Sequence, residues 1–498
     1  MFESVNATTE NLEVLLSALT RLDDADDDSE RVTQLDLLER LKAVCAGVQA
    51  RVTVDLAESQ TQIAEQWRQY SRGAADAGDF EAWRSARERA RAASCPEADA
   101  PSDSTGFQSE RRRRGGKARV DIGVATQVAL ARRESPHAGS RLVRLAFAVT
   151  HEMPYLLASM ESGLLSERRA SLVVQECAAL SLDHRVLVDA ELGQTVGEQL
   201  GQLSERELSS RVRAITYRLD AQAVVDRAAY AEGERRVTLR PAPDAMCWLT
   251  ALLPAAQGVG ALAALTRAAE SAKAAGDARG KGQVMADVLV ERVTGQESAA
   301  AVPVEVQLVM TESAVFSSGA TPACLTGYGS VPAEWARRLL SQTQGDTAGL
   351  PTGAQVLMRR LFTDPVDGTL VAMDSRRRVF DGALRRFLLA RDGGVCRTPG
   401  CGAPIRHLDH VVPHARGGRT SAANGQGLCV GCNLVKELAG WRVRGLQPTG
   451  PPGGGPHTVE ITTPTGHHYS GSAPPLVHED PGTVISPLER AIAASLAA

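Results

Sequence analysis

Lysine, cysteine and aromatic residues are all scarce in this chain of 498 residues. Aromatic residues make up 4% of the sequence, so its cores must be built mainly from alanine, leucine and valine, a composition that favours helices. Arginine supplies almost every positive charge, because lysine occurs only at positions 42, 117, 273, 281 and 436. Arginine abundance also follows genome composition, so by itself it does not indicate a phosphate-binding protein.

The chain also lacks a charge excess and a long apolar run. Its formal net charge is −4 and its pI about 6.2, so bulk charge does not indicate a polyanionic partner, although a local basic region fits within this balance. No basic segment followed by an apolar run opens the sequence MFESVNATTENLEVLL, and no stretch of about 20 apolar residues follows. We therefore expect a cytoplasmic protein with no membrane association, in which clustered cysteines are more often metal ligands than disulfides.

Amphipathic helices are predicted over residues 8 to about 92 and again from about 125 to 270. In the second region, breaks are expected near Pro154 and Gly163, and a helix is expected to start at Ser166. Ser204 with Glu207 three residues later matches a capping box, which marks another helix start.

Strand signals are fewer. Residues 235–258 predict a short strand, a turn and an apolar helix, and residues 302–310 alternate as a strand. The pairs Asp364-Pro365 and Asp367-Gly368 predict a hairpin turn, and two strand-like pieces follow residue 440. The basic run Arg111–Arg114 lies in a Pro/Ser-rich stretch that reads as a linker, where it is either a solvated charge cluster or a nonspecific DNA anchor.

Four of the nine cysteines form two closely spaced pairs. Four residues separate Cys396 from Cys401, and two separate Cys429 from Cys432. Each pair can present two thiolates to one ion, and together they supply the four sulfurs of a closed structural zinc site. Disulfides are the alternative, but the paired spacing and the expected reducing compartment favour Zn²⁺.

A structural zinc site does not explain the polar residues between the two pairs. The segment IRHLDHVVP alternates as a short strand that ends near His410, GRTSAANGQG is a polar loop, and LCVGCNLVKE enters a helix. This order would bring together Asp409 and His410 from the strand, Asn424 from the loop and Asn433 from the helix.

These residues resemble the motif of HNH endonucleases, which have the ββα-metal fold, in the version stapled by four cysteines. Asn433 fills the last motif position, where many relatives have histidine. Upstream, the segments RLVRLAFAVTHEMPYLLASMESGLLSERRASLVVQEC, DAMCWLTALLPA and LFTDPVDGTLVAMDSRRR are similar to the 13E12-repeat family. That bacterial group joins an N-terminal domain of unknown function (number 222) to a C-terminal HNH module, and the resemblance covers about residues 30–470.

The resemblance implies a mainly α fold: a large helical N-terminal region followed by a small α+β module, the zinc-stapled ββα-metal domain. The predicted parts are an N-terminal helical segment (1–93), a basic linker (94–120), a helical domain of unknown function with short strands (121–345), a hairpin connector (346–379), the HNH nuclease domain (380–445), and C-terminal strand pieces with a tail (446–498).

The implied activity is metal-dependent hydrolysis of phosphodiester bonds in DNA. His410, with an ordinary pKa near 6.5, would act as general base, and the resemblance gives Asn424 the role of orienting its ring. Asp409 and Asn433 would offer hard oxygen ligands to Mg²⁺ or another divalent ion. His414 is either a further ligand or a loop residue. Candidate phosphate contacts are Arg406, Arg416, Arg419 and Lys436.

Two rival interpretations remain at this point. In one, the chain is a non-cleaving zinc-ribbon protein that binds nucleic acid and keeps its HNH residues as relics. In the other, the helical region is an interaction scaffold and the nuclease is its cargo. The sequence makes no prediction about protein partners.

Overall fold

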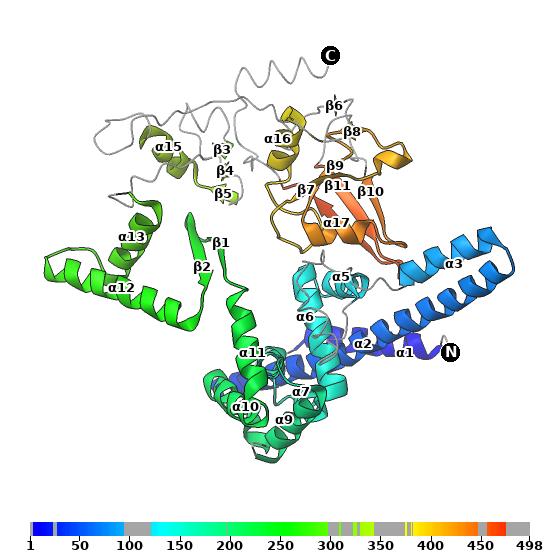
Figure 1. The fold of residues 1–498 in the computed structure, drawn as a ribbon, viewed down its shortest axis with the longest axis horizontal. Helices are drawn as coiled ribbons and strands as arrows, with labels where there is room; N and C mark the ends of the chain where they lie inside the picture. The colour runs from blue at the N-terminus through cyan, green and yellow to red at the C-terminus, as the bar shows by residue number, and fades with distance from the viewer. Residues whose placement is uncertain are drawn as a thin grey trace. The chain divides into compact units, whose positions relative to one another are not determined.

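The computed structural model describes residues 3–22, 27–93, 121–195, 197–296, 308–309, 322–325, 329–342, 374–375, 380, 382–446 and 456–474. Helices dominate these ranges, and the described strands form five small sheets of two or three strands each (Figure 1). The expected mainly α fold with a small α+β module is therefore confirmed. Within the same ranges, no helix is both long and apolar enough to cross a membrane.

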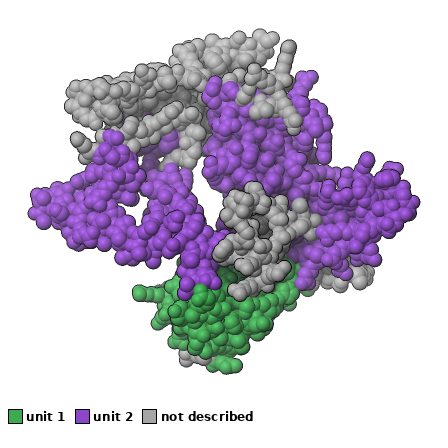
Figure 2. Space-filling view, in the orientation of Figure 1, with its two compact units in different colours: residues 1–55, 107–116, 144–224 green, residues 56–106, 117–143, 225–498 purple. Residues whose placement is uncertain are grey.

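Contacts divide the chain into two compact units, which Figure 2 colours separately. Unit 1 consists of residues 1–55, 107–116 and 144–224, and unit 2 of residues 56–106, 117–143 and 225–498. Unit 1 is helical. Its elements, some of which continue into unit 2, are α1 (Glu3–Leu19), α2 (Asp28–Asp76), α6 (Pro136–Phe147), the π-helical turn η1 (Ala148–Glu152), α7 (Pro154–Glu161), α8 (Glu167–Glu176), α9 (Leu182–Thr195), the 3-10 turn η2 (Gly197–Gly201), α10 (Glu205–Leu219) and α11 (Ala221–Glu232).

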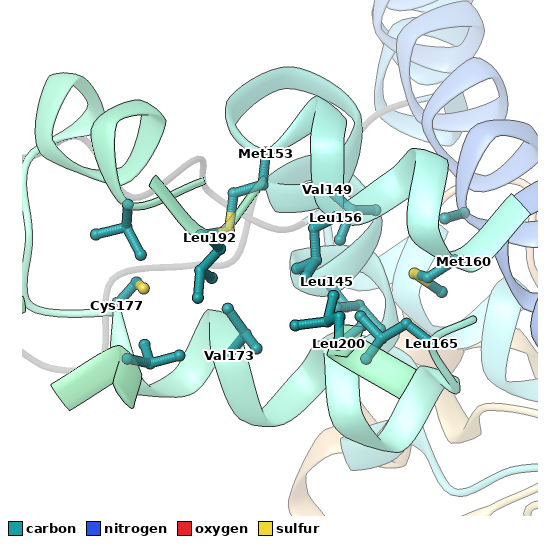
Figure 3. Close-up of a cluster of buried hydrophobic side chains, with 14 of the residues drawn as sticks. Leu145, Val149, Met153, Leu156, Met160, Leu165, Val173, Cys177, Leu192 and Leu200 are labelled. Atoms are coloured by element: carbon teal, nitrogen blue, oxygen red, sulfur yellow. The ribbon is translucent and has the colours of Figure 1, made fainter. Parts of the chain in front are cut away.

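Leucine, valine, alanine and methionine side chains fill the core of unit 1. Met153, Leu156, Val173, Leu192 and Leu200 are fully buried there and come from different elements (Figure 3). On each helix the buried positions recur three or four residues apart, which places them on one face. A core made almost entirely of aliphatic side chains agrees with the scarcity of aromatic residues.

Helix starts in unit 1 follow the expected signals. Ser204 and Glu207 form the predicted capping box at the start of α10, and α8 begins directly after Ser166. At α7, which begins at Pro154, the carboxylate of Asp189 accepts the backbone N–H groups of Tyr155 and Leu156 at 2.8 and 2.9 Å. Burial raises the pKa of Asp189, although these two bonds oppose that effect.

Unit 2 contains the remaining elements. Its helices are α3 (Phe80–Ala93), α5 (Ile122–Ala131), α12 (Ala255–Ala274), α13 (Lys281–Thr294), α15 (Ala333–Gln342), α16 (Gly382–Arg391), the 3-10 turn η4 (His414–Arg416) and α17 (Val430–Lys436). Its strands are β1 (Arg236–Ala242), β2 (Met246–Leu252), β3 (Leu308–Val309), β4 (Ala323–Leu325), β5 (Gly329–Val331), β6 (Asp374–Ser375), β7 (His407–His410), β8 (Thr420–Ser421), β9 (Gly425–Leu428), β10 (Arg442–Leu446), β11 (Thr458–Thr462) and β12 (His468–Ser472).

The segment predicted as a strand, a turn and a helix contains an additional strand. β1 pairs antiparallel with β2 from Arg236↔Leu252 to Ala242↔Met246, and α12 starts only at Ala255. The chain reverses at Asp244 and Ala245, which both adopt positive φ angles. A seven-residue apolar run such as MCWLTAL fits a helix or a strand, so pairing with β1 decides between them.

Several predicted elements lie largely outside the described residues. These are the linker at 94–120, the strand at 302–310 except for β3, and the hairpin connector at 346–379 except for β6. The strand-like pieces after residue 440 are confirmed: β10, β11 and β12 form one antiparallel three-stranded sheet.

This C-terminal sheet packs against α5 and α17. Leu130 of α5, Val435 of α17, Trp441 and Ile461 form one buried hydrophobic cluster. Nearby, Gln127 of α5 exchanges side-chain hydrogen bonds with Gln60 of α2, and its amide oxygen accepts from the Thr465 hydroxyl at 3.0 Å. Residues from three distant parts of the sequence therefore support one small module.

Replacing the buried Leu192 of α9 with alanine should destabilise unit 1 by about 2–5 kcal/mol, because the substitution leaves a cavity. Leu187 lies on the same helix and is 51% exposed, so Leu187→Ala should change stability by less than about 0.5 kcal/mol. Hydrogen–deuterium exchange of peptides within residues 144–224 measures the difference. Equal effects of the two substitutions would contradict the described core.

Candidate active site and thiol cluster

Two short strands and one helix build the site. β7 pairs antiparallel with β9, with His410 opposite Gly425 and Asp409 opposite Gln426. Two residues after β9, α17 begins with Cys429 as its N-cap. Figure 1 shows β7, β9 and α17 side by side, in agreement with their contacts. This is the ββα arrangement that the order of the motif residues predicts.

The four cysteines predicted to share one ion gather at one point. The metal-binding atoms of Cys396, Cys401, Cys429 and Cys432 all lie within 4.8 Å of one another. The sulfur of Cys401 is 3.7 Å from those of Cys429 and Cys432, far beyond the roughly 2.05 Å of a disulfide. A tetrahedral ion about 2.3 Å from each sulfur would hold them roughly 3.8 Å apart, so the geometry fits one metal ion and excludes disulfides.

Electrostatics inside the thiol cluster also favour a cation. Hydrogen bonds from the other thiols, chiefly from Cys396, lower the pKa of Cys429 well below its ordinary value, and the bond with Cys401 lowers the pKa of Cys396 to about 7. Hydrogen bonds with Cys396 raise the pKa of Cys401 and Cys432. Four thiols this close cannot all ionise unless a positive charge lies between them.

His410 is 7% exposed, and its ring is held from several sides. Its Nε2 atom forms a hydrogen bond of 2.9 Å with the Thr420 hydroxyl, and this bond opposes rotation of the imidazole. The ring of Phe380 packs against it at a centroid distance of 4.5 Å, and the ring of His414 lies 5.7 Å away. These contacts hold the imidazole in one orientation.

Asn424 closes the loop that follows His410. Its side-chain oxygen accepts the backbone N–H of Val412 at 2.8 Å, and its amide group donates to the carbonyls of Val412 and Arg419. Gly418 is required in this loop, because a Cβ atom there would lie 1.9 Å from the Val412 carbonyl oxygen. Asn424 thus closes this loop through backbone contacts, whereas the His410 ring itself contacts Thr420.

Asp409 and Asn433 offer oxygen atoms on the two facing elements. The Asp409 carboxylate forms an ion pair with Lys436 of α17, whose ammonium also lies 3.1 Å from a carboxylate oxygen of Glu437. Asn433 lies one helical turn before Lys436, on the same face of α17. The Asn433 side-chain oxygen is buried and accepts no hydrogen bond from any residue that the structure describes. A buried oxygen without a donor fits a cation ligand.

The candidate phosphate contacts separate into two groups. Arg416 and Lys436 line a cleft beside the site, whereas Arg406 and Arg419 are exposed and do not line it. Lys436 is only 6% exposed and is engaged by Asp409 and Glu437. It therefore supplies positive charge from within the site.

A buried charge network that the sequence did not reveal supports β9. The Arg391 guanidinium forms an ion pair with Asp392 and donates to the carbonyls of Ala422 and Gly425 at 2.5 and 2.7 Å. Asp392 accepts the backbone N–H of Gly427 at 2.8 Å and lies 3.6 Å from Arg397. Charged residues are rarely this buried unless they are paired. In the sequence, the only sign of this network is the adjacent pair Arg391-Asp392 within the apolar segment LLARDGGVC, and such a pair is usually exposed.

The same network binds the C-terminal sheet. Arg397 donates to the backbone carbonyls of His457 and Gly471 at 2.7 and 2.8 Å. The His457 ring donates from Nε2 to the Ala423 carbonyl at 2.9 Å. Burial, and then the charge of Arg391, lower the pKa of His457 to about 4.

Fold and site together define a module of the ββα nuclease type, with an attached cluster of four thiols that could hold one metal ion. The family model described as domain of unknown function (DUF222) matches residues 84–392, and the model described as HNH endonuclease matches residues 395–437. The chain therefore belongs to the DUF222 family and carries a C-terminal HNH endonuclease domain, as the resemblance predicts. No curated protein and no solved structure matches the chain.

Replacing Cys432 with serine should abolish tight metal binding at the thiol cluster, because one of its four sulfurs is lost. Cys45 is exposed and lies outside the cluster, so Cys45→Ser should retain the metal content of the wild type. Elemental analysis of the purified proteins measures the metal-to-protein ratio. Equal metal content in the two variants would contradict a shared ion site.

The nuclease module should lose stability as the pH falls from about 6.5 to about 4, in part through His457. Its pKa is lower in the folded than in the unfolded chain, so the unfolded state binds more protons in this window and acid favours unfolding. His457→Gln cannot be protonated there and should show a shallower pH dependence. Denaturant unfolding from pH 4 to 7 measures both slopes, and identical slopes would contradict a buried neutral imidazole.

Proposed function

We propose that this protein is a metal-dependent endonuclease that hydrolyses phosphodiester bonds in double-stranded DNA, with modest or no sequence preference. One observation carries the proposal. The buried imidazole of His410 contacts the Thr420 hydroxyl and lies next to Asp409 on β7. On the facing helix, the side-chain oxygen of Asn433 is buried and accepts no hydrogen bond from a described residue. The HNH endonuclease match supports the same assignment.

Hydrolysis needs a nucleophilic water, stabilisation of the phosphate charge and support for the departing 3′-oxygen. Neutral His410 would take a proton from the water as the water oxygen attacks phosphorus. The bond to the 3′-oxygen breaks, and this oxygen leaves with the bonding electron pair and takes a proton from solvent. Asp409 and Asn433 would hold a divalent ion such as Mg²⁺, which when bound supplies charge stabilisation at the phosphate. Asn424 would keep the His410 loop closed, and Arg406, Arg416, Arg419 and Lys436 would attract the nucleic-acid backbone.

The ion at the thiol cluster is proposed to be structural Zn²⁺. Four sulfur ligands complete a tetrahedral site and leave no position for water, so such a site stabilises the fold and does not take part in hydrolysis. Its ligands Cys429 and Cys432 lie at the first turn of α17, the helix that also carries Asn433. Metal binding there would therefore fix the helix that completes the active site.

Purified protein should nick supercoiled plasmid in the presence of Mg²⁺ or Mn²⁺, and His410→Ala should reduce the rate by about 10²–10⁴-fold because the general base is lost. Thr420→Val removes the hydroxyl that orients His410 and should lower the rate by about 10–100-fold, in the manner of other partners of functional histidines. Thr420→Ser keeps the hydroxyl and should restore most of the activity.

Metal content and DNA retention measured on the same preparations serve as controls for folding. DNA retention without nicking by the wild type would support the non-cleaving zinc-ribbon alternative. Nicking that persists in His410→Ala would overturn the proposed mechanism.

A further inference from the structure

A cleft of about 650 Å³ lies beside the candidate active site within unit 2. One wall is α3, which belongs to the N-terminal helical part of the sequence, and it contributes Ser85, Glu88, Arg89 and Arg91. The other wall belongs to the nuclease module and includes the loop after His410 and the segment from residue 436 to 443. The size falls within the range of ligand-binding clefts in proteins, roughly 300–1,000 Å³.

Positive charge dominates the lining of this cleft. Arg89, Arg91, Arg416, Lys436 and Arg442 line it, against two acidic residues from the same walls, Glu88 and Glu437. Glu437 already lies close to the ammonium of Lys436. These cations come from both walls and from four separate elements, α3, η4, α17 and β10. Such a distribution suits a polyanionic chain better than a single small anion.

Not every arginine of α3 faces the cleft. Ser85, Glu88, Arg89 and Arg91 line it, whereas Arg84 and Arg87 of the same helix do not. The Arg89 guanidinium lies over the ring of Trp67 of α2, 4.5 Å from its centroid. This cation–π contact restricts the side chain before any ligand binds, which reduces the entropy lost on binding.

The cleft is adjacent to the proposed chemistry. Val411 and Pro413, which line it, lie one and three residues after His410, and Lys436 forms the ion pair with Asp409. A nucleic-acid backbone lying in the cleft would therefore pass close to a phosphate placed at His410. The elements that supply His410, Asn424 and Asn433 do not include α3, so its role here differs from that of the nuclease motif.

We propose that this cleft binds the DNA backbone next to the scissile phosphate, with Arg89 and Arg91 of α3 and Arg442 of β10 as phosphate contacts. The inference rests on the proposed function, because it names where the same substrate continues beyond the active site. It assigns the helical region a part in substrate binding, in contrast to a scaffold that merely carries the nuclease. Arginine at each of these positions can form paired hydrogen bonds to phosphate oxygens.

The test compares two double variants of the full chain with equal loss of charge. Arg91→Gln/Arg442→Gln removes two cations from the cleft, and Arg84→Gln/Arg87→Gln removes two cations of α3 that do not line it. Both are made in the His410→Ala background for binding and in the wild-type background for nicking. Fluorescence anisotropy with a labelled duplex of about 30 base pairs gives the Kd at several salt concentrations, and metal content and melting temperature verify folding.

The cleft variant should bind the duplex at least about tenfold more weakly and lower the slope of log Kd against log salt by about 1.8, because each lost phosphate contact removes about 0.9. Its nicking kcat/KM should fall by a similar factor, whereas the matched variant should stay within about twofold of its parent in binding.

Different outcomes would contradict the proposed DNA-binding cleft and the proposed nuclease activity. If the wild type nicks and the two double variants bind DNA equally well, the cleft assignment is wrong and the nuclease assignment stands. If the wild type binds DNA without nicking and only the cleft variant weakens binding, the cleft assignment stands and the catalytic proposal fails. If no protein binds the duplex, both fail.

Discussion

Convergence of four thiol sulfurs on one point is the constraint on which the nuclease module depends. β7 and β9 are four residues long each and form a two-stranded sheet, which by itself would be marginal in water. The cluster joins the loop after α16, through Cys396 and Cys401, to the first turn of α17, through Cys429 and Cys432. Between these two tethers lie the strands and the loop that carry Asp409, His410 and Asn424. An ion held by the four sulfurs would fix the two ends of this segment together, so that a small segment with few apolar residues can hold a defined geometry.

A second set of stabilising contacts lies at the boundary between the two family matches. The DUF222 match ends at residue 392, and the HNH match begins at residue 395. Asp392, the last residue of the first match, accepts the backbone N–H of Gly427 in the second, and Arg391 donates to two carbonyls on either side of Asn424. Burying charges is unfavourable unless every one is paired, and here each guanidinium and carboxylate has partners. One continuous hydrogen-bond network therefore joins the segment that matches DUF222 to the segment that matches the HNH endonuclease domain.

Helices from the N-terminal part of the sequence also complete this module. α5 lies within the DUF222 match, and its Leu130 shares a hydrophobic cluster with Val435 of α17 and Trp441. This packing explains how a domain of unknown function can be tied to an HNH domain in one chain: part of its apolar surface is buried by the nuclease. Unit 1, by contrast, has its own aliphatic core and closes the start of α7 with the carboxylate of Asp189.

The sequence by itself determined whatever depends on local spacing and residue chemistry. Residues close together in the chain determine the helical class, the capping box at Ser204, the two closely spaced cysteine pairs and the strand–loop–helix order around His410. Helix periodicity and ligand spacing act over short range. Only the tertiary structure decided which distant groups meet. The Thr420 hydroxyl on His410, the Arg391-Asp392 network under β9, the second strand of the β1–β2 hairpin and the approach of α3 to the nuclease all result from packing between segments far apart in sequence. Burial, pairing and electrostatic environment are properties of such contacts, and a residue's neighbours along the chain do not specify them.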